Sequence, residues 1–453
     1  MKKLYLLLFA ACALACTGPR SREVAQAEPP VFEEHFTDST LRLDYVFCGD
    51  AKHQAIYLQE MVKTGPWAGR RQNLQEPLLR GNGQIRVKDS KTGAVLYSNS
   101  FSTLFQEWLD YEEAQNTQRA YENVFLVPFP KDTVQVEVVL IDKHGKQSAS
   151  ICHTVAPDDI LIRQMRENPY KQVLLCGGGA PESTIDIAIV SEGYTAAEEE
   201  LFFVDATRAR DALLAHEPFK SHAGQFTIRA VFVPSQASGP SIPHNGEWHN
   251  TLATSHFDTF YSERYLTTSS IQNVHDALGT IPFEHVIVMV NTPVYGGGGI
   301  YNNITIMGSG HPTFNQVLVH EFGHAFAGLA DEYFYGEQTE TPYPADTEPW
   351  EPNITTLKDF GSKWQDMLPD CAPIPTPVDS IENTDVRKIW NTLTKEQKMV
   401  LNRKLGVYEG AGYMPHGVYR PVQECRMKIN ECEEFCPVCT RAIERMTEYY
   451  TAP

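Results

Sequence analysis

The residues with the clearest chemical potential lie at 320–333, where the sequence reads H-E-F-G-H-A-F-A-G-L-A-D-E-Y. His320 and His324 are four residues apart, so a helix places both imidazoles on one face, where they can bind one metal ion. Glu321 follows the first histidine, and its carboxylate can reach a metal-bound water rather than the metal. The spacing predicts a zinc site that hydrolyses peptide bonds, with Glu321 as the general base. The alternative is two buried histidines beside a surface glutamate.

The residues after this helix predict the third metal ligand. A catalytic zinc usually takes three protein ligands and keeps one position open for water. Gly328 can end the helix in the left-handed conformation and turn the chain back, which brings up Asp331 as the third ligand, with Glu332 as the alternative. Gly323 lies inside the helix at a cost of about 1 kcal/mol in propensity, and we interpret it as room for another element close to the metal.

Alternating strands and helices are expected to position this site, in an α/β (α+β) domain over residues 158–453. Buried strands are expected at residues 185–190, 226–233 and 286–290. Thr195 and Glu198 have capping-box spacing and predict a helix start after the first strand. This order of elements predicts a mixed, twisted sheet covered by helices.

A glycine-rich segment precedes the active-site sequence. Residues 295–300 read Y-G-G-G-G-I, and only glycine supplies such backbone freedom at low cost. The segment leads into residues 301–307, which we interpret as an edge strand that can pair with an extended peptide. A hairpin loop is the alternative.

Residues 31–157 have the pattern of a separate all-β domain. Val134, Val136, Val138 and Leu140 alternate with polar residues and share one face of a strand. Short strands separated by turn sequences predict an antiparallel β-sandwich that serves as an accessory domain. Cysteines lie near both ends of this domain, at positions 48 and 152, and predict a disulfide between them.

The N-terminus has the features of an export signal. Residues 1–15 combine a short basic start, an apolar run and a small-residue boundary, as a secretory signal peptide does. The three residues before Cys16 resemble a bacterial lipobox, which predicts a lipid anchor at Cys16, with Cys12 as the competing acceptor. Without acylation the same boundary suits an ordinary signal peptidase. Residues 16–30 are polar and are expected to form a tether.

Composition narrows the class of protein and its partners. The 453 residues include 38 Lys and Arg against 57 Asp and Glu, a formal charge of −19, which argues against a nucleic-acid partner. With 42% hydrophobic residues, the chain is too apolar to be disordered. Beyond the N-terminus no apolar run is long enough to span a bilayer, so membrane contact is expected only through the lipid anchor.

Four further cysteines, at positions 425, 432, 436 and 439, form the pattern C-x6-C-x3-C-x2-C. A structural zinc site usually carries two close cysteine pairs, and here there is one. In an exported protein the pattern therefore favours disulfides over zinc, with no assignment of partners.

The segment 320–333 resembles the active-site sequence of the IgA-peptidase family, a metzincin-like group of secreted bacterial zinc endopeptidases. Metzincins carry H-E-x-x-H-x-x-G-x-x-H, or Asp at the last position, whereas here Gly and Asp each fall one residue later. The resemblance covers roughly residues 160–450, and a β-rich module commonly precedes this catalytic domain. It also takes in residues 190–195 (V-S-E-G-Y-T), 290–291 (V-N), 295–297 (Y-G-G), 351–353 (E-P-N), 425–427 (C-R-M) and 435–439 (F-C-P-V-C).

The resemblance implies a zincin-like fold, one catalytic Zn²⁺ and a protein or peptide substrate outside the cytoplasm. Met427 would correspond to the Met-turn, a methionine packed beneath the metal, although an ordinary core methionine is the alternative. Tyr413 or Tyr419, which precede it, can supply a phenol that stabilises the oxyanion, although tyrosines in such positions are more often packing residues. The family name suggests immunoglobulin as a substrate, a property that need not accompany the fold.

The competing hypothesis is a non-catalytic surface lipoprotein. Its metal would be structural, with four protein ligands and no open position, and its β-domain would bind glycan or protein. The number of protein ligands therefore distinguishes the two hypotheses.

Overall fold

The structure is a computed structural model that describes residues 29–336, 342–378 and 386–452. The predicted signal peptide, both candidate lipid acceptors and most of the predicted tether lie outside the described residues. Among the helices of these three ranges, none is both long and apolar enough to cross a membrane.

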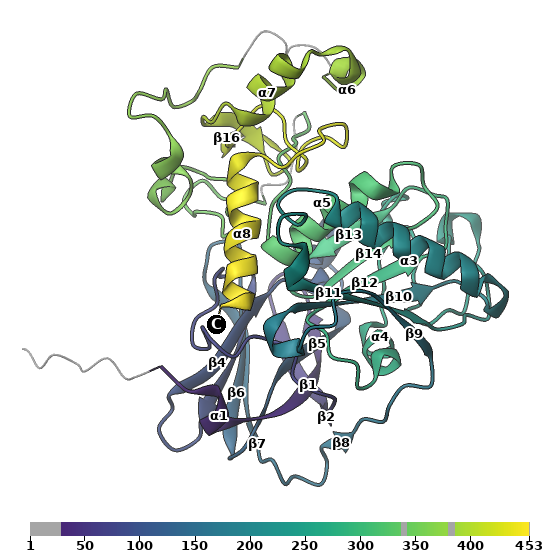
Figure 1. Cartoon of the computed structure of the whole chain (residues 1–453). Helices are drawn as coiled ribbons and strands as arrows, with labels where there is room; N and C mark the ends of the chain where they lie inside the picture. The colour runs from purple at the N-terminus through teal and green to yellow at the C-terminus, as the bar shows by residue number, and fades with distance from the viewer. Residues whose placement is uncertain (1–28, 337–341, 379–385, 453) are drawn as a thin grey trace, which may run out of the picture.

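The N-terminal part consists of two four-stranded sheets that pack face to face (Figure 1). The first has the strand order β5-β1-β2-β8, with β1 Phe36–Gly49, β2 Gln54–Lys63, β5 Arg119–Pro130 and β8 Arg163–Gln164. The second has the order β4-β3-β6-β7, with β3 Gly83–Asp89, β4 Val95–Phe101, β6 Val134–Ile141 and β7 Gln147–Val155. Phe101 of β4 packs on Phe125 of β5 with ring centroids 4.2 Å apart, which joins the two sheets through one core. Two short helices, α1 Phe32–His35 and α2 Leu104–Trp108, accompany the sheets.

The expected disulfide between Cys48 and Cys152 is wrong. Cys48 lies on β1 and Cys152 on β7, in different sheets, and neither is bonded to another cysteine. The neighbour of Cys152, His153, points into the core and lies 2.7 Å from the hydroxyl of Tyr45. Because side chains alternate along a strand, Cys152 points to the opposite, exposed face.

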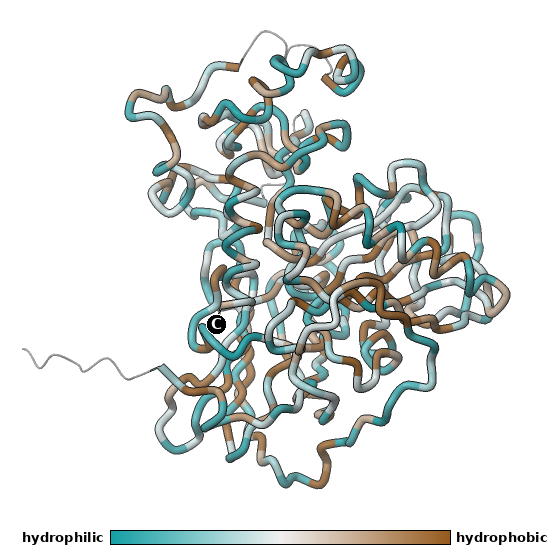
Figure 2. The backbone as a smooth tube through the Cα atoms, in the orientation of Figure 1, coloured by the Kyte–Doolittle hydropathy of each residue, from teal (hydrophilic) through white to brown (hydrophobic). Residues whose placement is uncertain are grey.

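The second part of the chain contains a six-stranded mixed sheet, as predicted, with the order β13-β14-β12-β10-β11-β9. Its strands are β9 Lys171–Cys176, β10 Ile185–Glu192, β11 Phe226–Phe232, β12 His285–Val290, β13 Gly297–Ile300 and β14 Ile304–Gly308. The four central strands are parallel, and β9 and β13 are antiparallel edges. The central strands are among the most hydrophobic segments of the chain (Figure 2).

Helices cover both faces of this sheet (Figure 1). The helices α3 Glu199–Leu214 and α5 Phe314–Ala327 share one core with Ile187 and Ile189 of β10. The helix α4 Ile271–Leu278 shares a second core with Ala188 and Val190, the alternate residues of the same strand. A strand buried on both faces reads as a continuous apolar run, which is why residues 185–190 were recognisable in the sequence.

The glycine-rich segment differs from the expectation. Residues 301–307 were expected to form an edge strand, but β14 lies inside the sheet, between β12 and β13. The edge strand is β13, which is formed by the glycines themselves, with Gly297 opposite Met307 and Gly299 opposite Thr305. The capping box that was predicted at Thr195 and Glu198 is confirmed and begins the turn that leads into α3.

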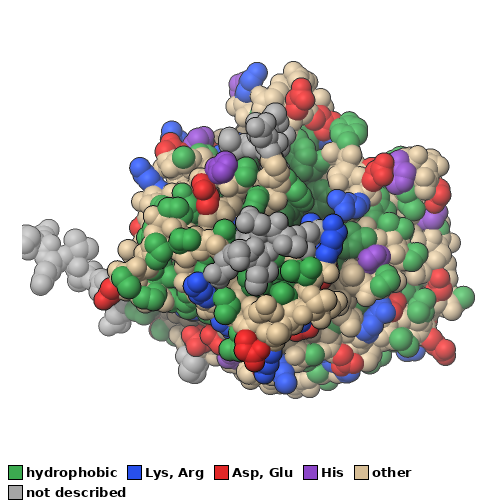
Figure 3. All heavy atoms as spheres, turned by 90° about the horizontal axis from the view of Figure 1, so that it is seen from above, with side chains coloured by type: hydrophobic (Ala, Val, Ile, Leu, Met, Phe, Trp, Pro, Cys, Tyr) green, Lys and Arg blue, Asp and Glu red, His purple; other side chains and the backbone are tan. Residues whose placement is uncertain are grey.

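The C-terminal region packs beside the helix α5 (Figure 1). It contains α6 Val386–Ile389, α7 Lys395–Arg403, β15 Tyr408–Ala411, β16 Met414–Arg420 and α8 Pro437–Thr451. Phe326 of α5 and Tyr450 of α8 stack with ring centroids 6.2 Å apart. On the face seen in Figure 3, basic side chains are scattered among acidic ones.

Candidate active site

The helix α5 and the turn that follows it bring three predicted residues together. The Nε2 atoms of His320 and His324 lie 3.0 Å apart, one turn apart on the helix. Asp331 Oδ1 lies 3.1 Å from His320 Nε2 and 3.3 Å from His324 Nε2. The turn depends on Gly328, which ends the helix in the left-handed region at φ 60° and ψ 30°.

The orientation of the two imidazoles suits a metal ion. His320 Nδ1 lies 3.0 Å from the carbonyl oxygen of Arg426, and His324 Nδ1 lies 2.5 Å from that of Leu329. A carbonyl only accepts, so each Nδ1 carries the ring hydrogen and each Nε2 presents a lone pair toward the other. Two facing lone pairs need a cation between them.

The distances and charges agree with such a cation. Ligand atoms at about 2.05 Å from a tetrahedral zinc lie about 3.3 Å from one another, close to the separations found here. The buried Oδ1 of Asp331 receives no hydrogen bond from the described residues. Burial lowers the pKa of His324, but attraction to Asp331 outweighs it and raises that pKa to about 9. The three side chains therefore attract positive charge, and a divalent metal fits the donor set.

Glu321 is held beside this cluster by the edge strand β13. Burial raises the pKa of Glu321, while the charges of the two histidines and a hydrogen bond from the Gly299 backbone act in the opposite direction. A Cβ on Gly299 would lie only 2.0 Å from the carbonyl oxygen of Glu321, so glycine is required for the strand to approach the helix this closely. The sequence indicated flexible glycines here but not this packing requirement.

The two candidate tyrosines differ in position. Tyr413 lies in the turn between β15 and β16 at φ 67°, and its hydroxyl donates a hydrogen bond to Asp331 Oδ2. Tyr419 lies on β16 and pairs through its backbone with Thr355. The structure therefore joins Tyr413 to the cluster, and none of the contacts found for Tyr419 reaches it.

Met427 packs against the helix α5 at Gly323. Its side chain is fully buried, and its sulfur lies 3.2 Å from the position that a Cβ on Gly323 would occupy. Gly323, which was predicted to leave room for another element, thus faces Met427. The carbonyl of the preceding residue, Arg426, is the acceptor for His320.

Glu332, the alternative third ligand, does not lie with the histidines. Its carboxylate oxygen Oε1 is 3.1 Å from the sulfur of Cys439, in a separate buried cluster. Asp331 and Glu332 are adjacent in the chain, but their carboxylates lie in two different clusters, so only Asp331 is placed with the histidine pair.

A residue of the N-terminal part also lies near the cluster, and no pattern in the sequence indicated it. Glu107 of α2 accepts a hydrogen bond of 2.6 Å from Tyr265, whose ring contacts the edge strand at Gly298. Burial raises the pKa of Glu107 to about 7, and the charges of Asp331 and His324 also act on it. No spacing in the sequence connects residues this far apart, so only the fold reveals this proximity.

Protein-family comparisons cover both parts of the chain. The family model described as IgA Peptidase M64 matches residues 173–404 and 387–447, a range that includes the histidine pair and Met427. The model described as Peptidase M64 N-terminus matches residues 31–151. No curated protein matches the chain closely enough to serve as a relative. A peptidase family supports a peptidase function, with a protein or peptide as substrate. The chain therefore belongs to the IgA peptidase M64 family.

Proposed function

We propose that this protein is a zinc-dependent endopeptidase with a zincin-like catalytic domain. The observation that carries the proposal is the cluster of His320, His324 and Asp331, in which two imidazole lone pairs and one carboxylate oxygen converge. Three protein ligands are the number that a catalytic zinc takes when one position stays open. When bound, zinc supplies a Lewis acid that polarises the scissile carbonyl and lowers the pKa of a water molecule toward 7.

Glu321 and Tyr413 supply the proton chemistry. Glu321 accepts the proton of the attacking water and delivers it to the leaving amine. Burial raises the pKa of the Tyr413 phenol well above its ordinary value, so the hydroxyl stays protonated. From its place beside Asp331 it can donate a hydrogen bond to the carbonyl oxygen as negative charge develops there.

The edge strand β13 is the proposed binding site for the substrate backbone. It ends the sheet, and its Gly299 contacts the active-site helix at Glu321 and His324. An extended peptide that pairs with this edge would run past the general base and the histidines, with backbone hydrogen bonds supplying affinity. This arrangement favours an endopeptidase, because binding along the edge strand does not require a free N- or C-terminus of the substrate.

We further propose that the enzyme is exported and anchored by lipid on Cys16, so that it acts on extracellular proteins. The proposal rests on the signal-like residues 1–15 and the lipobox-like sequence before Cys16. In a bacterial host fed radiolabelled palmitate, Cys16→Ser should abolish labelling and Cys12→Ser should retain it. The reverse pattern would assign the anchor to Cys12. If the parent and both variants all remain unlabelled, the protein has no lipid anchor.

Metal removal tests the proposed function. The purified protein should cleave an unfolded substrate such as casein, lose this activity with a chelator and regain it with zinc but not with magnesium. Cleavage that persists after the metal has been removed would exclude the zinc mechanism. Immunoglobulin A incubated in parallel tests the substrate that the family description suggests, and cleavage-site profiling of a peptide library gives the sequence preference. The non-catalytic lipoprotein is not favoured, because the family supports a peptidase.

A further inference from the structure

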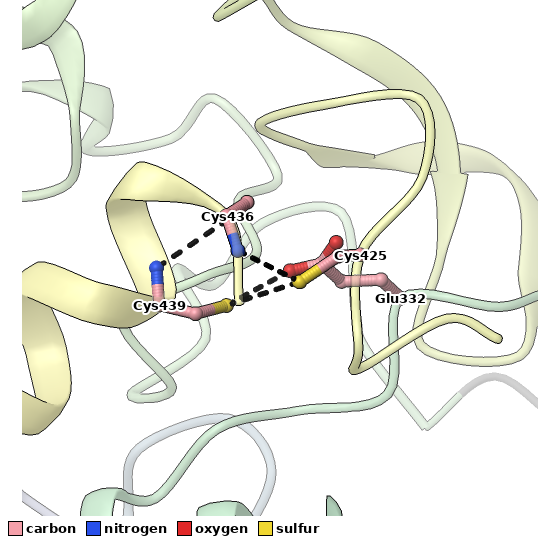
Figure 4. Close-up of side chains that lie close together, drawn as sticks. All are labelled: Glu332, Cys425, Cys436 and Cys439. Atoms are coloured by element: carbon pink, nitrogen blue, oxygen red, sulfur yellow. Dashed lines mark hydrogen bonds between the residues drawn. The ribbon is translucent and has the colours of Figure 1, made fainter. Parts of the chain in front are cut away.

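A second cluster of possible metal ligands lies apart from the active site (Figure 4). It consists of Glu332, Cys425, Cys436 and Cys439, one carboxylate and three thiols. All four residues are buried, with at most 1% of their surface exposed. One potential ligand atom from each lies within 4.8 Å of all the others. Three separate segments converge here: the turn after α5, the chain before Met427 and the start of α8.

The separations within the cluster suit a tetrahedral metal. The sulfurs of Cys425 and Cys439 lie 3.8 Å apart, and Cys439 Sγ lies 3.1 Å from Glu332 Oε1. Sulfurs at about 2.3 Å from a tetrahedral zinc are about 3.75 Å apart, and a sulfur and an oxygen around such an ion are about 3.5 Å apart. The first separation agrees closely, and the second needs a shift of a few tenths of an ångström.

The buried carboxylate gives an independent reason for a cation. Glu332 Oε1 accepts a hydrogen bond of 3.0 Å from Asn353, but the buried Oε2 has no hydrogen-bond partner among the described residues. A buried carboxylate without full compensation is costly, and coordination of a metal is one of the ways in which proteins satisfy it. Burial raises the pKa of Glu332 well above its ordinary value, and the hydrogen bonds from Asn353 and Cys439 and the charge of Arg420 only partly offset this.

The pattern of cysteines explains why the sequence favoured disulfides. Of the four C-terminal cysteines, Cys432 does not belong to the cluster, and its sulfur lies 3.4 Å from Nδ2 of Asn402. The fourth position is filled by Glu332, which lies far away in the sequence. None of the four described thiols is bonded to another. A search for two close cysteine pairs therefore missed a site that has one pair, one single cysteine and one glutamate.

We propose that Glu332, Cys425, Cys436 and Cys439 bind a second zinc ion, which has a structural role. Thiolates select zinc over magnesium and calcium, and four protein ligands leave no open position for a substrate. Glu332 donates its backbone N–H to the carbonyl oxygen of Met427 over 2.8 Å, and its chain neighbour is Asp331. The second ion would thus fix the positions of the third catalytic ligand and of the methionine beneath the active-site helix.

Zinc content measured on the mature full-length protein tests this proposal. Elemental analysis should find two zinc ions per chain in the parent protein and one in the double variant His320→Ala/His324→Ala. Cys439→Ser should lose the second ion, whereas Cys432→Ser, which alters a neighbouring buried cysteine outside the cluster, should keep both. This count is independent of peptidase activity, so the second site can fail while the proposed function stands.

A cobalt spectrum tests the same site without a cysteine substitution, so it remains informative if Cys439→Ser does not fold. The double histidine variant reconstituted with cobalt should show the intense near-ultraviolet absorption of cobalt–thiolate bonds. No metal in that variant, or peptide mapping that finds a disulfide between any two of Cys425, Cys436 and Cys439 in exported protein, would overturn the proposal. A metal with no thiolate absorption would overturn it as well.

Discussion

Asp331 and Glu332 are consecutive in the chain, but their carboxylates point into different clusters. Asp331 Oδ1 lies 3.1 Å from His320 Nε2, whereas Glu332 joins the three cysteines. Asp331→Asn should therefore weaken zinc binding at the histidine pair by at least about tenfold, because it replaces an anionic ligand with a neutral amide. Competition with a chromophoric chelator measures this affinity. The matched control is Asp346→Asn, which changes an exposed acid. Equal affinities in the two variants would remove Asp331 from the ligand set.

The tyrosines at 413 and 419 give a second prediction. Tyr413→Phe removes the hydroxyl beside Asp331 and should lower kcat by about 100-fold, in the range found for loss of one oxyanion donor. KM and zinc content should change little, because the ring and the metal ligands remain. Tyr419→Phe provides the matched control and should retain parental kcat. If both variants have the parental rate, Tyr413 is a packing residue.

The glycines of β13 give a third prediction. A Cβ on Gly299 would lie 2.0 Å from a backbone oxygen of α5, whereas one on Gly298 would meet only the ring of Tyr265 at 3.2 Å. Gly299→Ala should therefore push the strand away from Glu321 and lower both Tm and kcat/KM, and Gly298→Ala should have a smaller effect on each. Thermal unfolding and peptide hydrolysis of both variants check this order. Similar losses at the two positions would mean that the approach of strand to helix is not the constraint.

The buried His285 predicts sensitivity of the fold to acid. Burial lowers the pKa of His285 to about 3 from an ordinary value of 6.5, so below about pH 6.5 the unfolded chain binds a proton that the folded protein does not. The stability contributed is fully present above pH 6.5 and is lost as the pH falls toward 3, at up to about 1.4 kcal/mol per pH unit.

Removing this imidazole should reduce the loss of stability at acid pH. His285 packs edge-on against Phe322 and Phe326, so His285→Phe keeps an aromatic ring in the core. The variant should lose less free energy of unfolding than the parent between pH 6.5 and 4.5 in urea titrations. His53→Phe, at a position whose side chain is 84% exposed, should follow the parent. A pH dependence of His285→Phe that equals the parent's would contradict the assignment.

The parts of the site that the sequence could predict are those with short-range patterns. His320, Glu321 and His324 follow from helical spacing, and Gly328 marks the helix end through a conformation that glycine adopts readily. The central strands were recognisable because both of their faces are buried. Within this local segment, the sequence favoured Asp331 as the third ligand and kept Glu332 as the alternative, and only the fold shows that Glu332 lies in a different cluster.

The parts that could not be predicted depend on tertiary contacts between distant segments. Glu107 lies near the candidate site because it accepts a hydrogen bond from Tyr265, whose ring lies beside Gly298 of β13. Glu332 lies beside Cys425 although the two residues are far apart in the sequence. The difference between Tyr413 and Tyr419 depends on where the β15–β16 hairpin turns, since one residue lies in the turn and the other on the strand. No periodicity in a single sequence carries that information.

The most direct test of the central claim is the variant Glu321→Gln. It keeps the size of the side chain and leaves His320, His324 and Asp331 untouched, so zinc content should equal that of the parent. Loss of the general base should reduce casein cleavage by at least about 100-fold. Full zinc content together with this loss is the result that we predict, and full zinc content with an unchanged cleavage rate would contradict the proposed mechanism.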